Sequence, residues 1–221
     1  MSHDPSSTPA STPAHILAGT PADASAGTPP RAPASQAAFS SLTVFTGSAS
    51  GTDPEYTTET RELGSALAAV GISVVYGGAM VGLMGHLADA ALGAGGEVHG
   101  VIPEVLMDRE VAHQGLTSLE LVPDMHTRKS RMAELGDGFI ALPGGMGTLE
   151  EFFEVWTWQY LGLHAKPVGL YNVKGFWDPL LRMVEHMVAE GFMSPARRDA
   201  LVISADPQDL ITALRAWTPA I

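Results

Sequence analysis

The chain has 221 residues, of which 45% are hydrophobic, enough for one sizeable domain with a buried core. It contains no cysteine, which excludes disulfides, thiolate metal sites and a cysteine nucleophile and agrees with a reducing compartment. The formal net charge of −12 opposes a nucleic-acid-binding surface, which needs a concentration of basic side chains.

Residues 1–38 consist largely of Pro, Ala, Ser, Thr and Gly, with almost no large apolar side chains. Such a segment cannot bury enough surface to offset the entropy lost on ordering, so we expect a disordered tail before a domain at 39–221. The apolar run at 15–19 is too short for the core of a signal peptide. The longest apolar runs have the length of strands and not of membrane spans, so we expect a cytoplasmic protein without membrane contact.

The domain alternates short apolar runs with amphipathic segments. The expected strands lie at 42–45, 72–76, 98–102, 119–122, 139–142, 168–171 and 201–203. The expected helices lie at 54–70, 83–92, 127–135, 149–161, 178–190 and 207–217. Strands that are apolar throughout and are separated by helices indicate a parallel sheet covered on both faces. The predicted fold class is therefore α/β, a single Rossmann-like, doubly wound domain with a mostly parallel sheet.

Glycine-rich turns follow the first, second and fifth of these strands. They are Gly47-Ser48-Ala49-Ser50-Gly51, Gly77-Gly78 and Pro143-Gly144-Gly145-Met146-Gly147. The carboxyl ends of parallel strands share one edge of the sheet, where ligands of such folds bind. We therefore expect the three turns to meet at one crevice.

The turn after the fifth strand is the strongest candidate for a binding loop. Its three glycines permit φ > 0 and let main-chain N–H groups approach a ligand. Thr148 is predicted to be the N-cap of the following helix, so that the positive end of the helix dipole faces the loop. These features predict an anion site, most simply for phosphate. The alternative is an ordinary joint in which Thr148 and Glu151 form a capping box, but a cap does not require three glycines in four residues.

The usual cofactor motifs do not match. G-x-G-x-x-G does not follow the first strand, and the run 145–150 has a glutamate where the third glycine belongs. Residues 77–82 have the spacing of a Walker A loop, but Leu83 and Met84 replace its Lys and Ser/Thr. The histidines are scattered and no G-x-S-x-G elbow occurs. We therefore expect neither a metal nor an organic cofactor, and no serine nucleophile.

A carboxylate at an anion loop and a cluster of cations remain. Arg128, Lys129 and Arg131 place a quarter of all lysines and arginines within four residues. Glu150 and Glu151 are adjacent on a helix and point about 100° apart, so they cannot both face the ligand. A carboxylate can stabilise a positive sugar carbon or activate water, and an arginine can hold a phosphate or polarise a leaving group. This combination suits cleavage of an N-glycosidic bond in a nucleotide, and it would also serve simple nucleotide binding.

Two motifs resemble those of the Lonely Guy family of cytokinin riboside 5′-monophosphate phosphoribohydrolases. They are Met125-His126-Thr127-Arg128-Lys129-Ser130-Arg131-Met132 and Pro143-Gly144-Gly145-x-Gly147-Thr148-x-x-Glu151. Further similar segments occur in order between about residues 41 and 215, at 44–48, 76–78, 81–85, 101–103, 108–111, 157–158 and 166–170. The resemblance implies removal of ribose 5-phosphate from N6-substituted AMP, and in some bacterial relatives from AMP itself. The older family label of lysine decarboxylase finds no support, because nothing in the residues suggests a pyridoxal site.

By motif position, the resemblance implies Arg128 and Glu151 as the catalytic pair. The expected substrate-binding residues are Gly47, Ser48, Gly78, Glu110, Lys129, Pro143, Gly144, Gly145, Met146, Gly147, Thr148 and Glu150. Family members are homodimers, or assemblies of dimers, that bind a nucleoside monophosphate and need no cofactor. The aromatic residues of 152–160 are candidates for such an interface, although core packing explains most of them equally well.

Two positions depart from the family pattern, since Thr46 stands where many relatives have cysteine and Ala79 where many have a third glycine. We expect Ala79 to narrow the approach of the backbone to the nucleotide. The runner-up function is a binding protein of the same fold that holds a nucleotide or the molybdenum cofactor without turning it over. A pure binder has no reason to keep both Arg128 and Glu151, which favours the enzyme.

Overall fold

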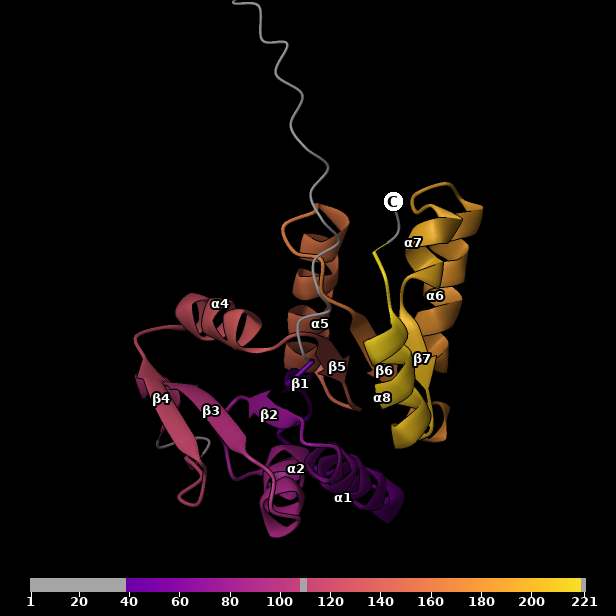
Figure 1. Cartoon of the computed structure of the whole chain (residues 1–221). Coiled ribbons are helices and arrows are strands. Elements are labelled where there is room, and N and C mark those ends of the chain that lie inside the picture. Colours follow the sequence, from indigo (N-terminus) through magenta and orange to yellow (C-terminus); the bar gives the residue numbers. More distant parts are fainter. Residues whose placement is uncertain (1–38, 108–110, 220–221) are drawn as a thin grey trace, which may run out of the picture. The chain divides into compact units, whose positions relative to one another are not determined.

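The computed structural model describes residues 39–107 and 111–219, so the tail predicted at 1–38 lies outside the described residues. Seven parallel strands form one sheet in the order β4-β3-β2-β1-β5-β6-β7 (Figure 1). The strands are β1 (Ser41–Phe45), β2 (Ser73–Tyr76), β3 (Val98–Pro103), β4 (Ser118–Val122), β5 (Phe139–Ala141), β6 (Val168–Tyr171) and β7 (Val202–Ser204). The predicted doubly wound α/β class is confirmed.

Helices cover both faces of this sheet. They are α1 (Pro54–Ala69), α2 (Gly82–Gly93), α4 (Met125–Leu135), α5 (Met146–Tyr160), α6 (Asp178–Ala189), α7 (Pro195–Asp199) and α8 (Pro207–Ala216), with the 3₁₀ turns η1 (Glu104–Leu106) and η2 (Val173–Gly175). Helices α1, α2 and α8 pack on one face, and α4, α5 and α6 pack on the other (Figure 1). The sequence does not predict α7 or the two turns, because segments of three to five residues carry no readable periodicity.

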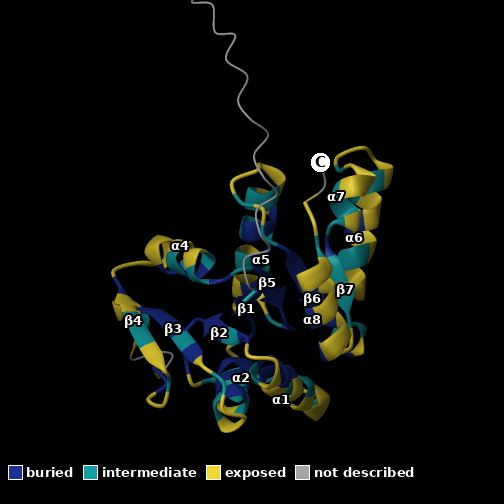
Figure 2. Ribbon diagram, viewed as in Figure 1, coloured by how far each residue is buried: buried dark blue, intermediate teal, exposed yellow. Residues whose placement is uncertain are grey.

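The central strands β1, β2, β5 and β6 are largely buried because each face of the sheet meets a helix layer there, whereas the edge strand β4 is mostly exposed or half-buried. In β1, Leu42 and Val44 join the core cluster on the side of α1, α2 and α8. Phe45 joins the cluster on the side of α4, α5 and α6. Figure 2 shows the central strands buried between helices whose outer surfaces are exposed, and the edge strand β4 mostly exposed or half-buried. Within the ranges that the structure describes, no helix is both long enough and apolar enough to cross a membrane.

The order of the strands leaves a crevice next to β1. This strand pairs with β2 on one side and with β5 on the other. The chain leaves β1 for α1 on one face of the sheet and leaves β5 for α5 on the opposite face. The two loops therefore separate at the carboxyl edge, which is where ligands bind in doubly wound folds.

Candidate functional site

The loops after β1, β2 and β5 meet at this edge, as the sequence predicts. Gly47 N donates to Pro143 O at 3.1 Å and joins the first loop to the fifth. Leu83 N, in the first turn of α2, donates to Gly47 O at 3.1 Å. Arg128 Nη2 donates to Gly77 O at 3.0 Å, which brings α4 to the end of β2. Segments that are far apart in the sequence thus surround one crevice.

A cavity of about 290 Å³ lies in this crevice and is called the main cavity below. It is lined by Thr46, Gly47, Ser48, Met84, Leu106, Met125, Arg128, Gly145, Met146, Gly147, Thr148, Glu150 and Glu151. The predicted catalytic pair, Arg128 and Glu151, therefore shares a cavity with the predicted binding loop. The lining combines charged groups with the apolar side chains of Met84, Leu106 and Met125, so the cavity suits a ligand with polar and apolar parts.

A second cavity of about 250 Å³ adjoins the first. It is lined by residues 47–51, Tyr56, Leu83, Pro143, Gly144, Gly145 and Phe176, and it shares Gly47, Ser48 and Gly145 with the main cavity. The rings of Tyr56 and Phe176 meet edge to face, with their centroids 5.9 Å apart. Two of the predicted substrate-binding residues, Pro143 and Gly144, line this second cavity and not the main one.

The glycines of the binding loop provide space and not unusual backbone angles. Gly144, Gly145 and Gly147 do not adopt the positive φ that glycine permits. A Cβ at Gly144 would collide with Thr148 Oγ1, which explains that glycine by packing. A Cβ at Gly145 or at Gly147 would meet no protein atom within 4 Å. Packing therefore does not require glycine at either position, and the missing side chains leave the main cavity open in front of the backbone.

Helix α5 begins before the predicted position. Gly145 is the N-cap, with extended angles (φ −94°, ψ −153°), and Met146 is the first helical residue. The prediction of Thr148 as N-cap is wrong: Thr148 is the third helical residue and is 4% exposed. Glu151 is the sixth helical residue, so its predicted place in the first turn is wrong, and so is the alternative of a capping box between Thr148 and Glu151. The first N–H groups of α5, at Met146 and Gly147, lack acceptors within the helix and lie at the main cavity.

Arg128 is presented by the first turn of α4. The Asp124 carboxylate caps this helix by accepting from Thr127 N at 2.8 Å, and this hydrogen bond lowers the pKa of Asp124. Arg128 is 5% exposed, and its Nη1 lies 3.8 Å from Met125 Sδ. An arginine keeps its positive charge even when it is buried. A fixed cation therefore forms part of the wall of the main cavity.

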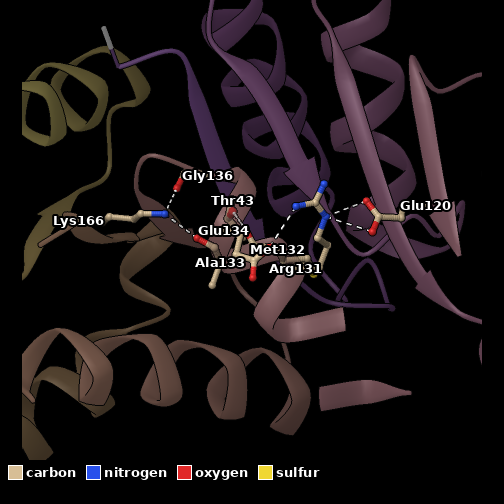
Figure 3. Close-up of polar contacts among 8 residues, drawn as sticks. All are labelled: Thr43, Glu120, Arg131, Met132, Ala133, Glu134, Gly136 and Lys166. Carbon is tan, nitrogen blue, oxygen red and sulfur yellow. Dashed lines mark hydrogen bonds and ion pairs between the residues drawn. The ribbon is translucent and has the colours of Figure 1, made fainter. Parts of the chain in front are cut away.

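Contacts along α4 hold this helix against the sheet (Figure 3). Thr43 Oγ1, on β1, donates to Met132 O at 2.7 Å. Lys166 Nζ donates at 2.6 Å to the carbonyl oxygens of Ala133 and Gly136 at the end of the helix. Burial lowers the pKa of Lys166 despite the nearby carboxylates. These bonds fix the position of α4 and, with it, the arginine that the helix presents.

The predicted cluster of three cations is divided between different partners. Arg131 Nε donates to Glu120 on β4 at 2.9 and 3.1 Å, outside the main cavity (Figure 3). Lys129 Nζ lies 2.5 Å from Glu150 Oε1 and 3.1 Å from Glu154 Oε2, both on α5. Burial lowers the pKa of Lys129, but these carboxylates outweigh it, so the pKa lies above its ordinary value. Lys129 does not line the main cavity and instead ties α4 to α5.

Three other positions lie away from both cavities or outside the structure. Gly78 has φ +78°, accepts from His113 N at 2.9 Å and lines neither cavity. Ala79, expected to narrow the approach to the nucleotide, is fully buried in the core and also lines neither cavity. Glu110 lies outside the described residues. Among the residues that are described, no group of three His, Asp or Glu side chains could hold a metal ion.

Four residues that line the main cavity are not among the predicted substrate-binding residues. They are Thr46, Met84, Leu106 and Met125. Met84 and Met125 belong to segments that carry the family resemblance, so the motifs signalled their importance but not their position. The aromatic residues of α5 are mostly explained by packing, since Phe152 and Trp156 are 0% and 6% exposed. Tyr160, at 53% exposed, remains on the surface.

The fold and the cavity define a Rossmann-like α/β protein with a glycine-rich loop lining a cavity at the switch point of its sheet. Residues 84–214 match the family model described as "Possible lysine decarboxylase". The chain belongs to this family, and the resemblance to its Lonely Guy members is confirmed by the relatives that follow.

Three relatives of similar sequence are named for the same activity. A cytokinin riboside 5′-monophosphate phosphoribohydrolase of Rhodococcoides fascians is 52% identical over 79% of this chain and 89% of its own length. A probable enzyme of the same name from Oryza sativa subsp. japonica is 46% identical, over 83% of this chain and 75% of its own length. A third, from Arabidopsis thaliana, is 44% identical over 83% of this chain and 86% of its own length.

Solved structures with this fold include a molybdenum cofactor carrier protein of Chlamydomonas reinhardtii, with a TM-score of 0.62 and 20% identity, covering 80% of this chain and 96% of the carrier. The molybdenum cofactor binding protein of Rippkaea orientalis has a TM-score of 0.60 and 20% identity, covering 80% and 95% of the two chains. At this identity the likeness concerns the fold alone.

Proposed function

We propose that the protein hydrolyses the N-glycosidic bond of cytokinin riboside 5′-monophosphates, which are N6-substituted forms of AMP. The products are the free base and ribose 5-phosphate, and AMP itself is a second candidate substrate. The names of relatives at 44–52% identity support this activity.

One observation carries the proposal. The open positions Gly145 and Gly147 face the same cavity as Arg128 and Glu151. The start of α5 offers backbone N–H groups and a positive dipole end to a phosphate. Because no protein atom lies within 4 Å of a Cβ at either glycine, a phosphate oxygen can approach these N–H groups closely. With the phosphate bound there, the carboxylate of Glu151, one turn further along α5, would lie near the ribose of the substrate.

The proposed reaction needs only water as a second reactant. The bond between C1′ and the base nitrogen breaks, and its electron pair leaves with the base. Glu151 stabilises the positive charge that develops on the sugar ring and takes one proton from the attacking water, whose oxygen bonds to C1′. Glu151 then releases its proton to the solvent and the departing base takes one up, so one molecule of water is divided between the two products and the carboxylate is restored. Arg128 supplies positive charge, either to the phosphate or to the base as it leaves.

The apolar wall supports a base that carries a hydrocarbon substituent. Met84, Leu106 and Met125 present flexible apolar side chains to the main cavity. Methionine adapts its shape to an irregular ligand and contacts the edges of aromatic rings favourably. We therefore expect isopentenyladenosine monophosphate to have a lower KM than AMP.

The test is incubation of the purified protein with each of these two nucleotides, followed by chromatography for free base and ribose 5-phosphate. We expect Glu151→Gln to lower kcat by about 10²- to 10⁴-fold, the range for loss of a general base. Glu62→Gln, at an exposed position of α1, is the matched control and should keep the wild-type kcat. Base release at the wild-type rate from Glu151→Gln would contradict the assigned role.

Arg128→Ala separates the two possible roles of the arginine. A rise in KM with unchanged kcat indicates that Arg128 binds the phosphate in the ground state, whereas a fall in kcat indicates action on the leaving group. Circular dichroism and urea unfolding check that both variants fold. If the wild type cleaves neither nucleotide but binds them, the non-catalytic carrier function takes its place.

A homodimer and a cytoplasmic location complete the proposal. The dimer rests on the family resemblance, and the absence of cysteine agrees with a reducing compartment. Light scattering coupled to gel filtration measures the mass in solution, and a monomer at micromolar concentration would oppose the first of these two points.

A further inference from the structure

The guanidinium of Arg128 occupies the space where a side chain at residue 77 would begin. A Cβ built on Gly77 collides with Arg128 Nη2 and would lie 3.1 Å from Arg128 Cζ. The same Nη2 donates to the carbonyl oxygen of Gly77 at 3.0 Å. Gly77 therefore holds the arginine in two ways, by the oxygen that it offers and by the side chain that it lacks.

The turn that carries Gly77 is fixed from both sides. Tyr76, which is fully buried, donates its hydroxyl to Ala79 O at 3.1 Å and closes the turn after β2. His113 N donates to Gly78 O at 2.9 Å from the segment that follows β3. Residues 79 and 112 also form an antiparallel bridge. The carbonyl of Gly77 consequently cannot turn away without breaking bonds on either side of it.

The arginine has little room to move in response to a new side chain. Arg128 is 5% exposed, and Met84 Sδ lies 3.3 Å from the position of a Cβ at residue 77. Met125 Sδ lies 3.8 Å from the other terminal nitrogen of the guanidinium. An added methyl group must push the guanidinium further along the cavity wall, because the turn behind it is held by hydrogen bonds.

We propose that Gly77 is a positioning residue for the hydrolysis and acts by holding the guanidinium of Arg128 at the main cavity. This inference rests on the proposed function of Arg128. The inference gives a role to Gly77, the first glycine of the turn after β2. This glycine is not part of the predicted phosphate loop and lines neither cavity.

The test is a cycle of four proteins: wild type, Gly77→Ala, Arg128→Ala and the double variant. A misplacement of a catalytic group by about 1 Å costs on the order of 100-fold in rate, so kcat/KM of Gly77→Ala should fall by about that factor, in the same parameter (kcat or KM) that Arg128→Ala changes. The urea midpoint of Gly77→Ala should also fall, because the methyl group collides with the arginine. In the Arg128→Ala background, where the guanidinium is gone, Gly77→Ala should leave the midpoint unchanged.

Gly93→Ala is the matched control, because a Cβ there meets no atom within 4 Å and the residue lies at the end of α2. It should keep the wild-type kcat/KM. The inference is overturned if Gly77→Ala keeps the wild-type kcat/KM, or if it lowers the urea midpoint equally with and without Arg128. If the proposed function is wrong, the wild type cleaves neither nucleotide. This outcome is distinct from a failure of the inference, because the urea midpoints of the four proteins do not depend on activity.

Discussion

Replacing Gly147 with alanine is expected to stabilise the fold and to weaken substrate binding at the same time. Gly147 is the second residue of α5, and a Cβ there meets no protein atom within 4 Å. Alanine is favoured over glycine in a helix by about 0.5–1 kcal/mol, and no clash offsets that gain. The free energy of unfolding should therefore rise by up to that amount.

The same methyl group stands where a phosphate must approach the backbone. Gly147 lines the main cavity beside the first N–H groups of α5. Loss of one hydrogen bond to a charged group costs about 1.5–3 kcal/mol. At about 1.4 kcal/mol for each factor of ten, KM for isopentenyladenosine monophosphate should rise by roughly 10- to 150-fold.

Urea unfolding and steady-state kinetics measure the two effects on one protein sample. Gly93→Ala is the control, because it adds the same methyl group to a helix in open space outside the main cavity. It should leave KM unchanged. A Gly147→Ala protein with the wild-type KM would refute the assignment of the phosphate to the start of α5.

Two further predictions concern the stability of the fold. Lys129→Met removes the cation that joins α4 to two carboxylates of α5 and should lower the free energy of unfolding by about 1–2 kcal/mol. Arg131→Met, which breaks more exposed pairs, should cost less than about 1 kcal/mol in the same urea titration, and equal losses would contradict the difference in burial. For Asp137, burial raises the pKa, but hydrogen bonds from Ser40 and Ser41 outweigh it and hold the pKa below its ordinary value. Its stabilising effect is therefore present above the unfolded pKa of about 4 and is lost as the pH falls through the folded pKa. Asp137→Ala should be about 1–2 kcal/mol less stable at pH 7, and the difference should vanish in acid; a constant difference down to pH 2 would contradict it.

The fold, and the edge of the sheet at which the site lies, can be predicted from the sequence because they depend on local patterns. Apolar runs of strand length that alternate with amphipathic segments allow only a covered parallel sheet. Parallel strands then place the turns after β1, β2 and β5 at one edge, whatever the details of packing. Predicted element bounds differ from the structure by no more than two residues except at α5. There, Thr148 and Glu151 have the sequence pattern of a helix cap, so the predicted start of the helix lies three residues after the observed one.

Which side chains reach the cavity depends on contacts between elements that are far apart in the sequence. Arg128 and Lys129 are neighbours in the sequence, yet the first lies against Gly77 at the cavity and the second pairs with carboxylates of α5. Nothing local distinguishes them, because their directions depend on how α4 docks on the sheet beside α5. The same holds for Gly77, whose need for a missing Cβ arises from an arginine 51 residues away. Sequence patterns record spacing along a chain, whereas contacts of this kind depend on where two separate elements meet in space.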